Sequence, residues 1–319
     1  MPRTDVGRTG AAPKSIAMNH VVITRQLTKR YGTTAVVQNL DLQIPAGCVY
    51  GFLGPNGSGK TTTMKILLSL ITPSAGEVEI FGQPMRRETR HQLLGRIGSL
   101  IENLSAYGHL TGRENLRIVQ RTLDASDQAV SRAVRLVRME QQLDKLVRNY
   151  SLGMKQRLGI AMALVRDPQL LILDEPTNGL DPAGIEEIRD LLVWLAREEG
   201  RTVMVSSHLL SEVERMASVI GILNRGQLLF QGSLEQLFDR RLPDVLVRTP
   251  DAPRAIQVLQ RLNPTTVADG LLLQGLDQPT VAATIAHLCA AQVPIWEVRR
   301  QQRSLEDVFI GLTGREGLL

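Results

Sequence analysis

The sequence predicts an α/β domain with a mainly parallel central sheet, followed by a smaller α+β unit. The apolar run PQLLILDEP (168–176) is bracketed by prolines, the pattern of a strand that a parallel sheet buries on both faces. Strand-like runs alternate with helical runs over the first three quarters of the chain, which favours βα units. Near Arg240 the pattern changes to short elements joined by hairpin signals.

The elements of the larger domain are predicted from hydrophobic periodicity and from glycine and proline breaks. Two half-buried strands open the domain, a short apolar strand runs into a glycine-rich turn, and the helix that follows stops before Pro73. A polar, mostly helical stretch separates these elements from the two later buried strands. The predicted ranges are strands over 21–32, 35–47, 49–54, 168–176 and 201–208, a helix over 60–71, and helical structure over 105–150.

The smaller unit is predicted to have the order βαββαβ, which resembles a ferredoxin-like module. We expect strands over 244–249 and 294–299, helices over 253–262 and 279–291, and a hairpin about Asp269-Gly270. Ser304 and Asp307 have the spacing of a capping box for a last helix. The domain boundary is predicted at 238–243, which leaves residues 239–319 as an accessory domain.

Bulk properties exclude several classes of protein. The 319 residues are 43% hydrophobic and 22% charged, the balance of a soluble globular chain. The net charge of +5 comes from cations spread along the chain, which favours a solvated mixed surface. Cys48 and Cys289 are too isolated for a zinc site or a disulfide framework, which fits a reducing cytosol. No apolar run reaches the roughly 18–20 residues of a membrane-spanning helix.

The N-terminal residues 1–18 are expected to be a disordered lead-in. They contain three basic residues but no apolar core, so they do not have the pattern of a secretory signal. Met18 as the true start remains an open alternative.

The stretch GPNGSGKTT (54–62) matches the phosphate-loop pattern G-x-x-x-x-G-K-[ST]. Such glycines let successive backbone N–H groups converge on phosphate oxygens, while the lysine reaches the β- and γ-phosphates and the threonine hydroxyl binds Mg²⁺. An ordinary glycine-rich turn is the competing interpretation, but the flanking strand and helix favour a nucleotide site. The expected nucleotide-binding residues are Gly54, Pro55, Asn56, Gly57, Ser58, Gly59, Lys60, Thr61 and Thr62.

Two adjacent acids, Asp174 and Glu175, end the buried strand at 170–174. The carboxyl ends of parallel strands face the ligand crevice, so Asp174 is placed to hold Mg²⁺ opposite Thr61. Glu175 is then placed to polarise the water that attacks the γ-phosphate. His208 ends another predicted strand, where a contact with the γ-phosphate competes with an ordinary surface role.

These residues, together with YSLGMKQRLGIAMAL (150–164) and NGLDP (178–182), closely resemble the ATP-binding cassette (ABC) ATPases over about 19–236. The resemblance implies a P-loop NTPase core over 19–238, with a helical subdomain at about 103–165. It further implies a Walker A motif at 54–62, a Walker B motif at 170–174 with Glu175 as catalytic glutamate, Asp181 in the D-loop, and His208 as switch histidine.

Two further nucleotide contacts are implied by the same resemblance. Tyr31 falls at the position whose aromatic ring stacks on adenine, although a tyrosine after a strand is often only a surface cap. Ser151 and Gly153 match the family signature, whereas Leu152 and Met154 depart from it. In the family this helix N-terminus contacts the ATP of a second subunit, so a dimer is implied.

Within the family, the sequence resembles the drug- and peptide-export branch, including ATPases of bacitracin-resistance and lantibiotic-immunity exporters. This implies ATP and Mg²⁺ as cofactors, a separate integral membrane permease as partner, and a place at the cytoplasmic face of the membrane. A soluble ABC ATPase acting on nucleic acid or the ribosome is the alternative, but we expect no nucleic-acid partner. A non-hydrolysing ATP sensor is disfavoured by the complete set of catalytic residues.

Glu102 ends the apolar run GSLIEN (98–103), where the family normally has the glutamine of its Q-loop. The replacement resembles the lantibiotic-immunity subgroup, and an exposed loop acid in a shifted alignment is the alternative. The resemblance implies that Glu102 contacts Mg²⁺ and the attacking water. We hypothesise that it strengthens the metal contact, repels the γ-phosphate, and affects transport coupling more than ATP affinity.

Overall fold

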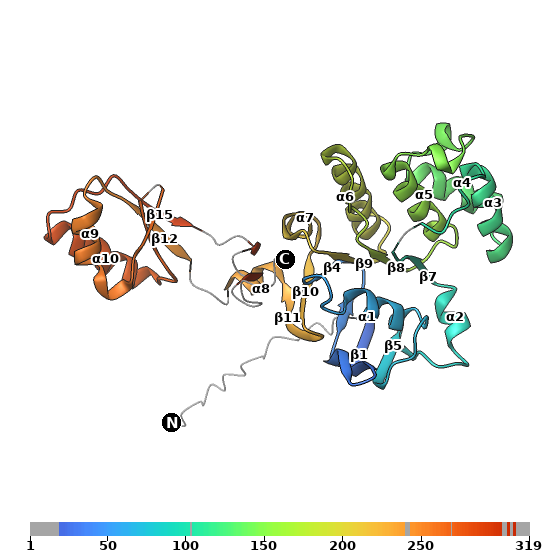
Figure 1. Cartoon of the computed structure of the whole chain (residues 1–319), viewed down its shortest axis with the longest axis horizontal. Coiled ribbons are helices and arrows are strands. Elements are labelled where there is room, and N and C mark those ends of the chain that lie inside the picture. Colours follow the sequence, from blue (N-terminus) through green and yellow to red (C-terminus); the bar gives the residue numbers. More distant parts are fainter. Residues whose placement is uncertain are drawn as a thin grey trace, which may run out of the picture.

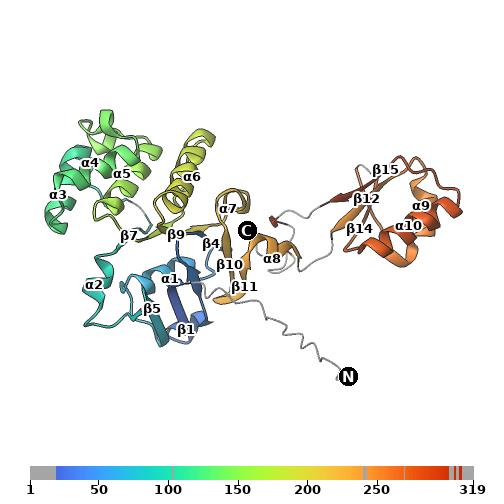
Figure 2. The same ribbon diagram turned by 180° about the vertical axis from the view of Figure 1, so that it is seen from behind.

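The computed structural model describes residues 19–102, 104–239, 243–268, 270–301, 305–306 and 309–310. These residues form a large unit, 19–239, and a small unit, 243–301 (Figure 1). Both views show the small unit standing apart from the large one (Figures 1 and 2).

The main sheet of the large unit has six strands in the order β11-β10-β4-β9-β8-β7. Five run parallel and β11 is antiparallel at one edge. The strands are β4 (Val49–Leu53), β7 (Ile97–Leu100), β8 (Leu170–Asp174), β9 (Thr202–Ser207), β10 (Val219–Asn224) and β11 (Gln227–Ser233). Every residue of β4, β8 and β9 is buried, which confirms the predicted parallel sheet and aligns the carboxyl ends of these strands.

A second, antiparallel sheet contains β1 (His20–Tyr31), β2 (Thr34–Leu40), β3 (Gln43–Pro45), β5 (Ala75–Ile80) and β6 (Gln83–Pro84). The single strand predicted over 35–47 was wrong, because the chain bends between β2 and β3. Asn39 has a φ of 44°, and the Asp41 carboxylate accepts a hydrogen bond from the Gln26 N–H at 2.6 Å. These contacts with β1 break the strand at a place that local alternation does not reveal.

Eight α-helices belong to the described residues of the large unit. They are α1 (Lys60–Leu67), α2 (Arg90–Leu94), α3 (Gly112–Leu123), α4 (Asp127–Leu136), α5 (Leu152–Leu164), α6 (Pro182–Arg197), α7 (Leu210–Met216) and α8 (Leu234–Asp239). The helix α1 is shorter than predicted, since Ser69 turns the chain with a φ of 55°. The helices α3, α4 and α5 pack together through Leu116, Val134 and Leu158 in one hydrophobic core, above the main sheet in Figure 1.

The small unit has the predicted ferredoxin-like order. Its elements are β12 (Asp244–Arg248), α9 (Ala252–Val258), a 3₁₀ turn (Gln260–Leu262), β13 (Thr265–Val267), β14 (Gly270–Leu273), α10 (Gln278–Ala290) and β15 (Glu297–Gln301). The strands pair antiparallel in the order β13-β14-β12-β15. Val247, Ala255 of α9 and Leu288 of α10 share one core, so both helices cover the same face of the sheet. The last strand begins at Glu297, three residues later than predicted.

The chain returns to the large unit after β15. Leu305 and Phe309 are buried in the same core as Phe230 and Leu237, whereas the sequence assigned them to the accessory domain. The boundary at 238–243 stays a prediction. Residues 1–18, Asp269, Ser304 and Asp307, to which predictions were also attached, lie outside the described residues.

Within the described residues, no helix combines the length and the apolar character needed to cross a bilayer.

Candidate active site

The loop at 54–59 joins β4 to α1 and depends on glycine at two positions. Gly59 has a φ of 106°, and a Cβ there would lie 2.6 Å from the Val36 carbonyl oxygen of β2. A Cβ on Gly54 would lie 2.4 Å from the Leu223 carbonyl oxygen. Both contacts are with backbone atoms, which cannot move aside as a flexible side chain does. The loop is therefore held closely between β2 and β10, at the carboxyl end of β4.

Lys60 is buried at the start of α1. Its Nζ donates hydrogen bonds to the carbonyl oxygens of Gly54 at 2.7 Å and Pro55 at 3.3 Å, and lies 3.9 Å from Glu175 Oε1. Burial lowers the pKa of Lys60, while the charges of Glu175 and Asp174 partly oppose this shift. The Ser58 hydroxyl is buried with no hydrogen-bond partner. Anionic oxygens of a ligand would satisfy both groups.

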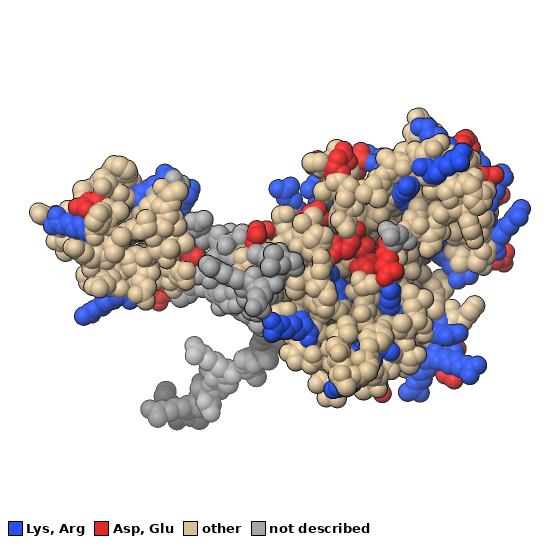
Figure 3. Space-filling view, viewed as in Figure 1, with Lys and Arg blue, Asp and Glu red and all other residues tan. Residues whose placement is uncertain are grey.

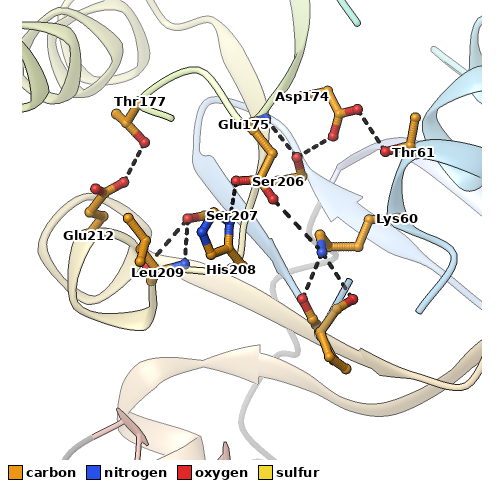
Figure 4. A network of polar contacts seen from close by, with 12 residues as sticks. Lys60, Thr61, Asp174, Glu175, Thr177, Ser206, Ser207, His208, Leu209 and Glu212 are labelled. Atoms are coloured by element: carbon orange, nitrogen blue, oxygen red, sulfur yellow. Dashed lines mark hydrogen bonds and ion pairs between the residues drawn. The ribbon is translucent and has the colours of Figure 1, made fainter. Parts of the chain in front are cut away.

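The acidic pair lies opposite this loop, as Figure 4 shows. The Thr61 hydroxyl donates to Asp174 Oδ2 at 2.7 Å, and the Ser206 hydroxyl donates to Asp174 Oδ1 at 2.5 Å. The Ser206 oxygen in turn accepts the Glu175 N–H at 2.9 Å. One serine of β9 thus fixes both a carboxylate and the backbone of the residue that follows it.

Glu175 lies between two cationic or potentially cationic groups. His208 Nδ1 is 2.6 Å from Glu175 Oε2, while Lys60 Nζ is 3.9 Å from the other carboxylate oxygen, Oε1. The residue has a φ of 50°, a conformation that is costly for a side chain other than glycine and persists only where neighbours hold it. The structure therefore brings Lys60, Thr61, Asp174, Glu175 and His208 into one cluster.

A buried contact behind this cluster was not anticipated from the sequence. Thr177 donates its hydroxyl hydrogen to the carboxylate of Glu212 on α7, and both side chains are buried. The contact ties the chain after Glu175 to the helix after His208 (Figure 4). Ser206 was likewise not predicted from the sequence, although a polar pair ending an otherwise apolar strand was a usable signal. No comparable local signal marks Thr177 or Glu212.

Ser206→Ala is expected to lower the free energy of unfolding by about 1–3 kcal/mol, because it leaves a buried carboxylate oxygen and the Glu175 N–H without their partner. Urea unfolding of the purified chain measures this change. Ser99→Ala, an exposed serine on β7 of the same sheet, is the matched control and should stay within about 0.5 kcal/mol of the unchanged chain. Equal effects in the two variants would contradict the role assigned to Ser206.

The remaining residues predicted for the loop lie on its accessible side. Asn56 and Gly57 are exposed, whereas Pro55 and Thr62 are partly buried. Tyr31 ends β1 with 52% of its surface exposed, and Lys29 Nζ is 5.0 Å from its ring centroid. Since Tyr31 pairs with Thr34 at the start of β2, the ring lies in the hairpin that packs against the phosphate loop.

Ser151 and Gly153 lie elsewhere, at the N-terminus of α5. The Ser151 side chain caps this helix by accepting the Met154 N–H at 3.2 Å. Together with Leu180 and Asp181, the two residues line a surface pocket of about 470 Å³. No recorded contact joins them to the phosphate loop among the described residues, and α5 is well separated from α1 in both ribbon views.

Glu102 follows β7 and contacts Lys65 of α1, with Oε1 and Nζ 2.5 Å apart. Within the described residues, no group of three or more histidine, cysteine, aspartate or glutamate side chains is arranged to hold a metal ion by itself. A metal ion at this edge would therefore need other ligands, such as the Thr61 hydroxyl, phosphate oxygens or water.

A phosphate loop facing acids at parallel strand ends defines a nucleotide-binding ATPase of the α/β class. Comparison with known proteins makes this more specific, since the family model described as ABC transporter matches residues 37–178. The chain is 39% identical to the bacitracin transport ATP-binding protein BcrA of Enterococcus faecalis, over 94% of this chain and 99% of that protein. It is 41% identical to the lantibiotic transport ATP-binding protein SrtF of Streptococcus pyogenes, over 68% of this chain and 96% of that one.

The fold agrees with this assignment. The dimeric structure of MJ0796, a bacterial ABC transporter cassette, superposes with a TM-score of 0.62 at 25% identity, covering 67% of this chain and 98% of that one. The chain belongs to the ABC transporter ATP-binding family and is an ATP-binding ATPase. These comparisons confirm the family and the fold class predicted from the motifs.

Proposed function

We propose that this chain is the ATP-hydrolysing subunit of an ABC exporter that moves a peptide antibiotic or a similar drug through a separate membrane permease. The similarity to the bacitracin transport protein carries this proposal, because it extends over nearly all of both chains. The chain would act at the cytoplasmic face of the membrane and pass its motion to the permease.

The described cluster supplies the groups needed for in-line attack of water on the γ-phosphate. Lys60 binds the β- and γ-phosphates, and Glu175 takes up the proton of the attacking water while His208 orients the Glu175 carboxylate. Thr61 and Asp174 offer adjacent hard oxygen ligands that fit Mg²⁺, which would offset negative charge on the phosphates. Glu175 positions the water and Lys60 holds the γ-phosphate, so the rate enhancement comes mainly from orientation of the reactants and from electrostatic stabilisation.

A second copy of the chain would complete each site. Ser151 and Gly153 are far from the phosphate loop of their own chain, yet a capped helix N-terminus suits the γ-phosphate oxygens of a partner's ATP. Tyr31, exposed beside the loop, would stack on adenine. Glu102 would touch the metal ion and the attacking water, and so link the nucleotide site to the permease.

Reconstitution with the candidate permease in lipid vesicles tests the proposal. The expected result is ATP-dependent movement of labelled bacitracin or a lantibiotic, with substrate-stimulated ATP hydrolysis. The same vesicles carrying Glu175→Gln should bind ATP without moving the peptide. Vigorous ATP hydrolysis by the unchanged chain with no binding to any permease, but stimulation by ribosomes or nucleic acid, would overturn it.

A further inference from the structure

The ion pair between Lys65 and Glu102 is not explained by the roles proposed above. Lys65 lies on α1, about one turn beyond Lys60 and Thr61, and Glu102 follows β7. Among the described residues, neither side chain has a second recorded ion pair. The contact therefore joins the helix that begins at the phosphate loop to the chain that leads into α3, α4 and α5.

The sheet register brings the end of β7, which Glu102 follows, to the edge of the sheet where the acidic pair lies. The parallel strands β7 and β8 have Leu100 next to Leu173, so the chain leaves β7 at the same edge where Asp174 and Glu175 end β8. Acidic side chains gather in the middle of the face drawn in Figure 3, with basic atoms directly beside them. Three carboxylates at one edge repel one another and a bound triphosphate unless cations offset them.

The backbone of Glu102 has an uncommon conformation. Its φ of 60° lies in the left-handed region, which a residue with a side chain adopts only where its surroundings hold it. The hydrogen bond from Lys65 is the one recorded for its carboxylate in the described part of the chain. The Glu102 side chain is 61% exposed and that of Lys65 is 30% exposed, so solvent screens the pair and its removal should leave the fold intact.

We propose that Lys65 is a positioning residue for Glu102. Its ammonium group holds the carboxylate at the edge of the nucleotide site and offsets the extra negative charge. The edge thereby accepts both a divalent cation and a triphosphate. This inference rests on the proposed function of the site as a binder of ATP with a divalent cation.

Lys65→Met tests the inference through two binding equilibria. Without its counter-charge, Glu102 attracts a cation more strongly and repels the phosphates more strongly. We therefore expect Mn²⁺ in the presence of ADP to bind about two- to fivefold more tightly. Metal-free ATP, titrated in EDTA, should bind about two- to fivefold more weakly. Electron paramagnetic resonance follows Mn²⁺, and fluorescence of a labelled ATP analogue follows the nucleotide. Partial loss of the fold would weaken the binding of both ligands. A higher affinity for Mn²⁺ together with a lower affinity for metal-free ATP therefore identifies an electrostatic role.

Three further variants sharpen the test. Lys65→Arg should keep both affinities, and Arg254→Met, which removes an exposed cation on α9 of the small unit, should leave both unchanged. In a Glu102→Gln background, Lys65→Met should have no further effect, because the carboxylate it offsets is gone. An equal effect in that background, or no change in either affinity, would overturn the inference. An unchanged chain that binds neither ATP nor Mn²⁺ with ADP would overturn the proposed function and, with it, this inference.

Discussion

Glu175→Gln is expected to bind ATP about as tightly as the unchanged chain and to hydrolyse it about 10²–10⁴-fold more slowly. The carboxylate lies between Lys60 Nζ at 3.9 Å and His208 Nδ1 at 2.6 Å, and it follows the residue placed to hold the metal ion. An amide of the same shape keeps these contacts in part but cannot take up the proton of the attacking water. Single-turnover hydrolysis and equilibrium ATP binding, measured on the same preparation, separate the two effects.

The matched control for this variant is Glu186→Gln. Glu186 is an exposed glutamate on α6 that pairs with Arg189 one turn away. Its loss removes one negative charge from the chain without touching the cluster, so hydrolysis should be unchanged. Hydrolysis by Glu175→Gln within a factor of two of the unchanged chain would remove Glu175 from the role of general base. A parallel loss of ATP binding would instead assign it to the binding of nucleotide.

Fold class and the phosphate loop were readable from the sequence because their signals are local. Strands buried on both faces have to be apolar at every position, which makes β8 and β9 recognisable without any partner. Gly54 and Gly59 are required because backbone carbonyl oxygens lie where their Cβ atoms would be. This requirement is visible in the sequence as the fixed glycine positions of the motif. The small unit was predictable for a similar reason, since short strands and helices alternated between clear turn residues.

The rest of the site depends on residues far apart in the sequence. Ser206 acquires its role only because β9 pairs with β8, which brings its hydroxyl to Asp174. Lys65 meets Glu102 only because α1 lies beside the end of β7. The break between β2 and β3 likewise results from contacts with β1, where Asp41 meets Gln26. Each of these features follows from tertiary packing, and neither periodicity nor local motifs report contacts between segments far apart in the sequence.

Lys60→Met is expected to weaken ATP binding at least about tenfold. Hydrogen bonds to a charged group contribute about 1.5–3 kcal/mol each, and every 1.4 kcal/mol is about a factor of ten in affinity. The Lys60 ammonium group donates hydrogen bonds to two backbone carbonyls and lies 3.9 Å from Glu175, so phosphate oxygens would give it charged acceptors in place of neutral ones. Isothermal titration with ATP and Mg²⁺ measures the loss, with Arg254→Met on α9 as the control for removal of a cation. Unchanged ATP affinity would contradict the assignment of the loop.

The same variant should not lose stability in the absence of nucleotide. Burial lowers the pKa of Lys60 below its ordinary value of 10.5, so the folded chain binds this proton less readily than the unfolded chain. Below both pKa values the lysine is protonated in the folded and the unfolded chain, and the cost of burying the charge is fully present. As pH rises toward 10.5 the folded lysine releases its proton first and stability increases. Lys60→Met removes both the cost and this increase. We therefore expect its melting temperature at pH 7 to be no lower than that of the unchanged chain, and the dependence of its melting temperature on pH to be flatter as pH rises toward 10.5. A lower melting temperature at pH 7 would show that Lys60 stabilises the fold in the absence of nucleotide. The expected result would mean that the Lys60 ammonium group contributes to ATP binding and not to the stability of the fold.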